Sequence, residues 1–256
     1  MYMLVSSVNP LKIYYHDGFL RVSLEKYDKA SLQANMHMTN TELTKKIIKD
    51  CEKYGKTHNG MTAAEMRDFQ MQTLEQLAEH LLASGQVTDP HWLDNYLRPE
   101  FKRAYLAAAK MIEERFYQSS DVFEMYGVDI IMDKDFRLYI IEVNASPMVV
   151  GTSSKKTALM KNMLTGLMDI VFAQQYSRTS RTLKYVQKHR ADILKAKKAG
   201  KHRARFEQLY RNYVEPQYQH MVDNNPWTVL YDGSLDGKYE KYLGLVDNEC
   251  VDLIDK

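Results

Sequence analysis

The clearest indication of the fold is residues 127–144, GVDIIMDKDFRLYIIEVN. Two runs rich in Ile, Val and Tyr flank a polar tetrapeptide, which is the pattern of a β-hairpin. With an even-length connection, Asp129 pairs with Ile140, and successive side chains alternate between the two faces. One face then receives Asp129, Glu142 and Asn144, while the other receives Val128, Ile130, Ile141 and Val143. The hairpin therefore predicts two carboxylates and an amide on one surface of an antiparallel sheet.

Residues 1–28 also predict strands. Three short apolar runs are separated by Asn9-Pro10 and Asp17-Gly18. Turn signals between β-rich runs favour an antiparallel meander, whose third strand we place in FLRVSL.

Helical patterns fill residues 41–116 and resume after residue 153. Thr62 and Glu65 have the spacing of a capping box. In the second region we expect three helices, over residues 153–176, 180–198 and 201–214. The fold class is therefore α+β, an antiparallel sheet flanked by helices, with a helical C-terminal extension.

Composition excludes several classes of protein. The chain has 256 residues, 45% of them apolar and 27% charged, which excludes a fully disordered chain. No run of about 18 apolar residues occurs, so we expect no membrane span. Cys51 and Cys250 fit neither a disulfide framework nor a zinc site, so we expect a reducing, intracellular compartment. The sequence has no glycine-rich phosphate loop of the Walker or Rossmann type.

Charge is unevenly distributed, although the formal net charge is only +2. Residues 178–211 contain twelve Lys or Arg and two acids, whereas residues 215–256 contain nine acids and three bases. We therefore divide the chain into a domain at 1–176, a basic helical segment at 177–214 and an acidic C-terminal tail at 215–256. The basic segment either attracts an acidic partner or is a solvated helical face that the tail neutralises.

The shared face of the hairpin suits a metal ion. Mg²⁺ takes oxygen ligands, usually one or two carboxylates together with substrate phosphates. Asp129, Glu142 and Asn144 are therefore candidate ligands, and a metal held there would offset the charge that develops in phosphoryl transfer. The alternative is that they are ordinary surface residues of a strand.

Two other segments carry polar candidates. Arg21 follows the Asp-Gly turn, and a guanidinium can hold a phosphate or a carboxylate through two parallel hydrogen bonds. The cluster HMTN offers His37, Thr39 and Asn40 just before a helix. Each has a plain structural alternative: an exposed strand residue for Arg21, a helix N-cap for Thr39 or Asn40, and a hydrogen-bonded structural histidine for His37.

Three stretches occur in the order and with the spacing of a known family: YMLVSSVNPLKIYYHDGFLRVSLEKY, NMHMTN and FEMYGVDIIMDKDFRLYIIEVNASP. On these stretches the chain resembles the tubulin–tyrosine ligase-like family of ATP-grasp ligases, over about residues 1–175. The resemblance implies a partial ATP-grasp domain, from a fold in which two α+β subdomains grip ATP. It also implies a reaction in which ATP phosphorylates a carboxylate and the amine of an amino acid attacks the acyl phosphate.

The resemblance also implies site residues and partners. The Mg²⁺ ligands look like Asp129, Glu142 and Asn144. Arg21 looks like the arginine that binds phosphate or the substrate carboxylate. Thr39 and Asn40 look like part of the nucleotide and substrate site, and Ile141 is expected to line the adenine pocket. ATP and Mg²⁺ are the implied cofactors. The implied partners are a free amino acid and tubulin or microtubules with their acidic tails, in the cytoplasm at the cytoskeleton, including the cilium or flagellum.

The family pattern also bears on how much of a ligase the chain holds. In the family, a Lys and an Asp-x-Arg that touch nucleotide and substrate precede the first strand, and Met1 falls just after that Arg. We therefore expect the chain to correspond to the C-terminal half of such a ligase, and whether it is an enzyme by itself stays open.

Two functions compete. The first is ATP-dependent ligation of tyrosine, glutamate or glycine to tubulin, as part of a longer protein. The second is a catalytically inactive fragment or pseudoenzyme that binds microtubules through its basic helices. Nucleic acid is disfavoured as a partner, because no RNA-binding motif or stacking aromatic platform accompanies the charges.

Overall fold

The computed structural model describes residues 1–8, 10–116, 122–151, 153–195, 209 and 213–233. They form two compact units. Unit 1 comprises Met1, Asp17–Pro99 and Met148–Asn162. Unit 2 comprises Tyr2–His16, Glu100–Pro147 and the described residues from Met163 onward. None of the helices within the described ranges combines the length and the apolar character needed to cross a bilayer.

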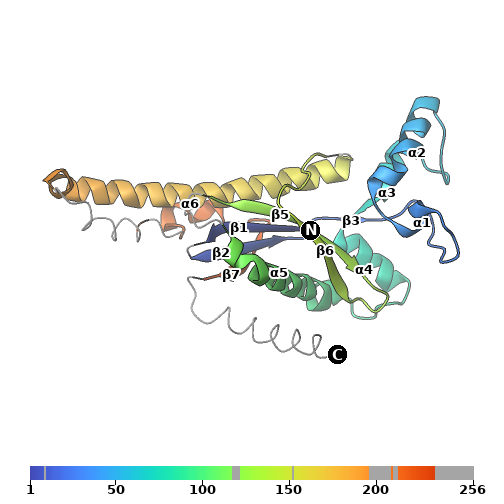
Figure 1. Cartoon of the computed structure of the whole chain (residues 1–256), viewed down its shortest axis with the longest axis horizontal. Helices are drawn as coiled ribbons and strands as arrows, with labels where there is room; N and C mark the ends of the chain where they lie inside the picture. The colour runs from blue at the N-terminus through green and yellow to red at the C-terminus, as the bar shows by residue number, and fades with distance from the viewer. Residues whose placement is uncertain (9, 117–121, 152, 196–208, 210–212, 234–256) are drawn as a thin grey trace. The chain divides into compact units, whose positions relative to one another are not determined.

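Unit 2 is built on a five-stranded sheet in which all neighbouring strands are antiparallel. Its strands are β1 (Tyr2–Val8), β2 (Leu11–His16), β5 (Glu124–Met132), β6 (Leu138–Asn144) and β7 (Thr228–Asp232). Their order is β6-β5-β1-β2-β7, so β1 is central and β6 and β7 are the edges (Figure 1). The central position explains why β1 is a nearly continuous apolar run, since both of its faces are buried.

The helical elements of unit 2 are α5 (Arg98–Ile112), η2 (Glu113–Arg115), η3 (Pro216–Met221) and most of α6 (Ser154–Lys195). The two long helices cover opposite faces of the sheet. Tyr105 of α5 lies against Tyr15 of β2, with ring centroids 5.4 Å apart. Tyr14, the preceding residue, instead hydrogen-bonds Gln174 of α6 and Ser6 of β1. Successive strand residues face opposite sides, so α5 and α6 bracket the sheet, as Figure 1 shows.

Buried contacts hold β7 at its edge of the sheet. Lys12 Nζ pairs with Asp232 Oδ2 at 2.9 Å, and these two residues are register partners across β2 and β7. Trp227, just before β7, is buried and donates from Nε1 to the carbonyl of Met163 at 2.8 Å. Burial, with a smaller contribution from the charge of Asp232, raises the pKa of Tyr14 to about 12. A largely buried ion pair and a buried tryptophan therefore hold this edge.

Unit 1 consists of short elements around a small core. They are β3 (Leu20–Arg21), α1 (Ala34–His37), α2 (Thr41–Tyr54), α3 (Ala63–Phe69), β4 (Met71–Gln72), α4 (Leu74–Ala83) and the π-helix η1 (Leu93–Leu97). The core cluster contains Leu24, Ile48, Cys51 and Met66. The predicted capping box is confirmed: Thr62 caps α3, and the Glu65 side chain returns a hydrogen bond to the Thr62 amide. A second box, Thr73 with Gln76, starts α4.

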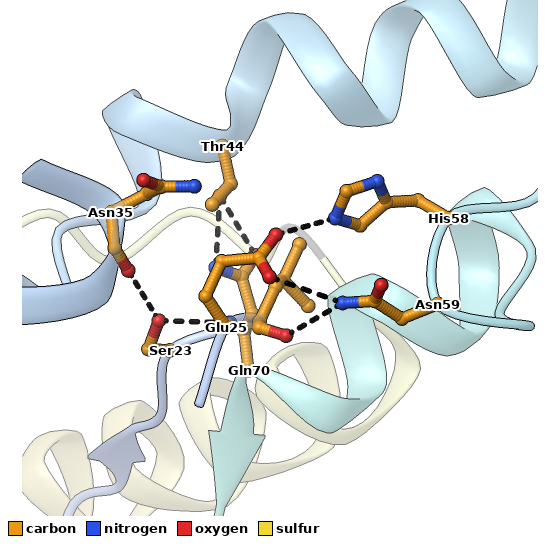
Figure 2. Close-up of polar contacts among 8 residues, drawn as sticks. Ser23, Glu25, Asn35, Thr44, His58, Asn59 and Gln70 are labelled. Carbon is orange, nitrogen blue, oxygen red and sulfur yellow. Dashed lines mark hydrogen bonds and ion pairs between the residues drawn. The ribbon is translucent and has the colours of Figure 1, made fainter. Parts of the chain in front are cut away.

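Polar side chains tie the loops of unit 1 together, as Figure 2 shows. His58 Nε2 lies 2.6 Å from Glu25 Oε1, and Asn59 Nδ2 donates to Glu25 Oε2 at 3.3 Å. In a separate contact, Gln70 Nε2 donates to the Thr44 hydroxyl at 2.8 Å, and both of these residues are buried. The first set joins the loop after β3 to the turn before α3, and the second joins α2 to the end of α3.

The predicted third strand of the N-terminal meander is wrong. β3 is only two residues long, and it pairs with β4 rather than with β2. Gly18 adopts a left-handed φ of 66°, and the chain passes from unit 2 into unit 1 after His16. The free edge of β2 is taken by β7 instead, from a segment that we had placed in the acidic tail. The rest of that tail, residues 234–256, lies outside the described residues.

The predicted break between the helices 153–176 and 180–198 is also wrong. α6 runs from Ser154 to Lys195 and departs from helical geometry only at His189, with φ −113° and ψ 17°. No Gly or Pro lies between Gly166 and His189, so nothing in the backbone ends the helix at residue 176. Of the predicted helix at 201–214, residues 201–208 and 210–212 lie outside the described residues.

Candidate functional site

The β5–β6 hairpin places the predicted carboxylates directly opposite each other. Asp129 pairs with Glu142, and Gly127 pairs with Asn144. The predicted pairing of Asp129 with Ile140 is therefore wrong, because Ile140 pairs with Ile130. The shared face of Asp129, Glu142 and Asn144 follows from the observed register all the same.

A β-bulge makes this register possible. The connection between β5 and β6 spans residues 133–137, an odd number, which alone would put Asp129 and Glu142 on opposite faces. The register shifts between Asp129 and Ile130, which leaves Ile141 as the extra residue on β6. The bulge thus restores the alignment of the carboxylates. Ile141 is 65% exposed, so its predicted place on a core face is wrong.

The turn at the tip of the hairpin is organised by Asp133. Its Oδ1 accepts hydrogen bonds from the amides of Asp135 and Arg137, both at 2.9 Å. These hydrogen bonds, chiefly the one from Arg137, hold the pKa of the Asp133 carboxyl below its usual range. Phe136 completes the turn with a left-handed φ of 63°. Asp133 therefore acts in the turn, at the far end of the hairpin from Asn144.

At the other end of the hairpin, Asn144 is held by a hydrogen bond to Glu142 and by the tight turn that follows it. Its Nδ2 donates to Glu142 Oε1 at 3.0 Å, which fixes both side chains on the exposed face of β6. A Cβ at Gly127, opposite Asn144, would lie 2.8 Å from the Cβ of Pro147. Glycine at 127 is therefore required by the turn that follows Asn144.

This donor set fits a hard cation. Like charges directly opposite on a sheet destabilise it, and a cation between Asp129 and Glu142 would remove that cost. Within the described residues, no group of three or more His, Cys, Asp or Glu side chains could hold a metal ion. The candidate set is therefore two carboxylates completed by the amide oxygen of Asn144.

The other predicted site residues lie in unit 1. Arg21 is an exposed residue of β3 and pairs with Met71 of β4. Asn40 is the N-cap of α2, where its Oδ1 accepts from the amide of Glu42 at 3.0 Å, and Thr39 is exposed beside it. His37 lies 2.6 Å through Nε2 from the carbonyl of Ser31. The structural alternatives for Asn40 and His37 are thus realised, and a ligand role for Asn40 would use its amide nitrogen.

Comparison with known proteins identifies the family. The model of the tubulin-tyrosine ligase family matches residues 1–182. The chain belongs to the tubulin-tyrosine ligase family.

The alignment with each individual relative covers most of this chain but only a small part of the relative. Tubulin glycylase 3F of Tetrahymena thermophila is 26% identical over 69% of the chain and 18% of its own length. The protein monoglycylase TTLL8 of Mus musculus is 28% identical over 57% of the chain and 16% of its own length. The probable alpha-tubulin polyglutamylase Ttll1 of Tetrahymena thermophila is 29% identical over 64% of the chain and 37% of its own length. The chain thus spans between a sixth and about two fifths of these curated relatives.

In this member of the tubulin-tyrosine ligase family, sequence reasoning missed one charged residue. Lys156 in the first turn of α6 is only 8% exposed, and its Nζ lies 5.3 Å from the ring centroid of Phe19. The signal that could have found it is helical spacing. Lys156 continues the buried stripe of α6 that contains Met160, Met163, Leu167 and Ile170.

The structure also changes the expected basic surface of this family member. Arg178 and Arg181 are buried rather than solvated. The Arg181 guanidinium lies 3.8 Å from the ring centroid of Tyr213, and it donates to the Tyr213 carbonyl at 3.1 Å. Lys184 lies 3.6 Å from Glu215. Lys188 and Arg190 are exposed on α6, whereas Lys197, Lys198, Lys201, Arg203 and Arg205 lie outside the described residues.

Proposed function

We propose that the protein carrying this chain ligates an amino acid to tubulin with the use of ATP. The observation that carries this proposal is the alignment of Asp129 with Glu142 on the exposed face of the hairpin, with Asn144 bonded to Glu142. Membership of the tubulin-tyrosine ligase family and relatives named as tubulin glycylases and a polyglutamylase support it.

The hairpin would hold Mg²⁺ through Asp129, Glu142 and Asn144. A bound Mg²⁺ supplies neutralisation of phosphate charge during phosphoryl transfer. The residues of the chain supply placement, because the hydrogen bond from the Asn144 amide to Glu142 Oε1 orients both side chains and leaves the Asn144 oxygen and the second carboxylate oxygen for a ligand. The bulge at Ile141 sets the register on which this alignment depends.

In the proposed reaction, a carboxylate oxygen of tubulin attacks the γ-phosphorus of ATP and ADP leaves. The amine of the incoming amino acid then attacks the acyl carbon, loses a proton and displaces inorganic phosphate. We assign Arg21 to an oxyanion of the phosphate or of a substrate carboxylate, since a guanidinium matches either in a bidentate geometry. Thr39, the Asn40 amide nitrogen and Ile141 are assigned to the nucleotide and substrate site, with Ile141 against adenine.

The test is incorporation of a labelled amino acid into tubulin by the protein carrying this chain, with Mg-ATP. Relatives named as glycylases and as a polyglutamylase match with similar identity, so glycine, glutamate and tyrosine are supplied in parallel. We expect ATP-dependent incorporation of one of them. Incorporation that is independent of ATP, or that survives replacement of both Asp129 and Glu142 by amides, would contradict the proposal.

A second candidate is microtubule binding without ligation. The exposed cations Lys184, Lys188 and Arg190 on α6 favour it, because acidic tubulin tails would be attracted to them. Burial of Arg178 and Arg181 weakens it, since those two charges are already used inside unit 2.

A further inference from the structure

Lys156 is a charged residue at a buried position of α6 where the neighbouring positions of the same stripe are apolar. The Ser153 hydroxyl accepts a hydrogen bond from the Lys156 amide at 3.2 Å, which fixes this residue in the first turn of α6. The side chain is 8% exposed, whereas its neighbour Lys155 is exposed. Lys156 is therefore held in position by both its backbone and its packing.

The surroundings of Lys156 do not neutralise its charge. Lysine is almost never fully buried unless it is paired with an acid. No acidic side chain in the described part of the chain offsets Lys156; the charged group that acts on it is Arg21, another cation. Burial first, and then the charge of Arg21, lower the pKa of the Lys156 amine. The Phe19 ring, whose centroid lies 5.3 Å from Lys156 Nζ, offers a cation–π attraction, which is weaker than the cost of burying a charge that no acid neutralises.

Three features of this place point to an anion. Lys156 Nζ lies 5.3 Å from the ring centroid of Phe19, the residue just before β3, and the charge of Arg21 in β3 acts on the Lys156 amine. The two cations repel each other, and a negative group between them would turn that repulsion into attraction. The amino end of the 42-residue α6 adds a further partial positive charge in its first turn.

We propose that Lys156 and Arg21 form a two-cation site for an oxyanion, a phosphate or a carboxylate group, on the Phe19 side of β3. The guanidinium supplies a planar pair of donors, and the ammonium supplies a compact charge beside it. The inference deepens the proposed function and rests on it for the role of Arg21. Lys156 is the added residue, which would give the site the second charge that a dianionic phosphate requires.

The full chain is tested with inorganic phosphate, with acetate as the carboxylate probe and with chloride at matched ionic strength. Binding is measured by calorimetry for the wild type, Lys156→Met, Arg21→Met and the control Lys155→Met. We expect Lys156→Met and Arg21→Met to weaken phosphate binding about tenfold or more, and Lys155→Met to change it by less than about twofold. Stronger binding of phosphate than of acetate identifies a phosphate site, and the reverse identifies a carboxylate site.

Thermal unfolding separates an anion site from a purely structural lysine. Without phosphate, Lys156→Met is expected to unfold at the wild-type temperature or above, because methionine removes an unpaired buried charge. Phosphate should raise the unfolding temperature of the wild type and of Lys155→Met, but not that of Lys156→Met. Equal stabilisation of all three proteins by phosphate would overturn the proposal.

A second measurement needs no variant and covers the case in which Lys156→Met does not fold. Lysines of the wild-type chain are acetylated with a water-soluble reagent, and the rate at each lysine is read by peptide mass spectrometry. Phosphate should slow acetylation of Lys156 and leave Lys155 unchanged, whereas the same slowing by chloride at matched ionic strength would overturn the site. These measurements contain neither tubulin nor ATP. A protein that binds phosphate through Lys156 but ligates nothing would therefore contradict the proposed function alone.

Discussion

Each edge of the unit 2 sheet carries a pair of charged residues that lie opposite each other on neighbouring strands, but the signs of the charges differ between the two edges. At the β7 edge, Asp232 lies opposite Lys12 in a largely buried ion pair, with side chains 16% and 10% exposed. At the β6 edge, Asp129 lies opposite Glu142, a pair of like charges on a more open face. The first arrangement stabilises the fold, whereas the second costs stability unless a cation binds. The comparison separates an edge whose charges are paired within the fold from an edge that carries two like charges.

The largest expected effect concerns the β6 edge. Glu142→Gln should lower ligation by the protein carrying this chain about a thousandfold, because metal stabilisation of transferring charge is worth several kcal/mol. The free energy of unfolding should stay the same or rise slightly, since a like-charge pair is removed. The control is Asp135→Asn, which removes one carboxylate from the exposed tip of the same hairpin. Wild-type ligation by Glu142→Gln at saturating Mg²⁺ would show that this edge binds no catalytic metal.

At the β7 edge the same kind of change should act on stability. Asp232→Asn leaves Lys12 buried without its partner, so the free energy of unfolding should fall by about 3 kcal/mol, measured by urea denaturation. The double variant Lys12→Met/Asp232→Leu should recover most of that loss, because apolar residues can replace a buried pair. If the single variant is as stable as the wild type, the contrast between the two edges does not hold.

The two edges also differ in how much of their structure could be predicted from the sequence. Alternation along β6 was enough to place Glu142 and Asn144 on one face, but Asp129 joins them only because the bulge offsets a connection of odd length. It was not enough to find the bulge, because a bulge at Ile141 is a backbone event that residue periodicity does not encode. β7 was missed because its partner β2 lies about 200 residues earlier, and Thr228–Asp232 lies in a segment whose charge suggested a tail. Lys156 was missed because a Lys-Lys pair at a helix start resembles a solvated surface.

A smaller effect at the β7 edge is the dependence of protein stability on pH. The pKa of Tyr14 is raised from 10.0 to about 12, so the folded state keeps this proton longer than the unfolded state does. The stabilisation is therefore fully present below pH 10 and is lost as pH rises from 10 to 12, by about 2–3 kcal/mol in total. Tyr14→Phe removes the titrating group, and its stability should fall less than that of the wild type across this range. Parallel stability–pH curves for the two proteins would contradict the assignment.

The smallest effect concerns the exposed cations of α6. Reversal of Lys188 and Arg190 to Glu should weaken co-sedimentation with microtubules about fivefold at low salt, and less at high salt, because exposed charges are screened. The control reverses Lys46 and Lys49 on α2, the same change of charge in unit 1. Microtubules stripped of their acidic tails by protease complete the series. Equal binding to stripped and intact microtubules would leave α6 without a role in docking.

The strand order also has a consequence for synthesis. The strand that covers the edge of β2, Thr228–Asp232, is made about 200 residues after β2 itself. At translation speeds of roughly 5–20 residues per second, the edge of β2 stays open for about 10–40 s on the ribosome. An open apolar edge is a template for pairing with other chains, so this interval is when the nascent protein is most exposed to aggregation. A chaperone that shields β2 until β7 arrives would act during that interval, and slower codons between the two strands would lengthen it.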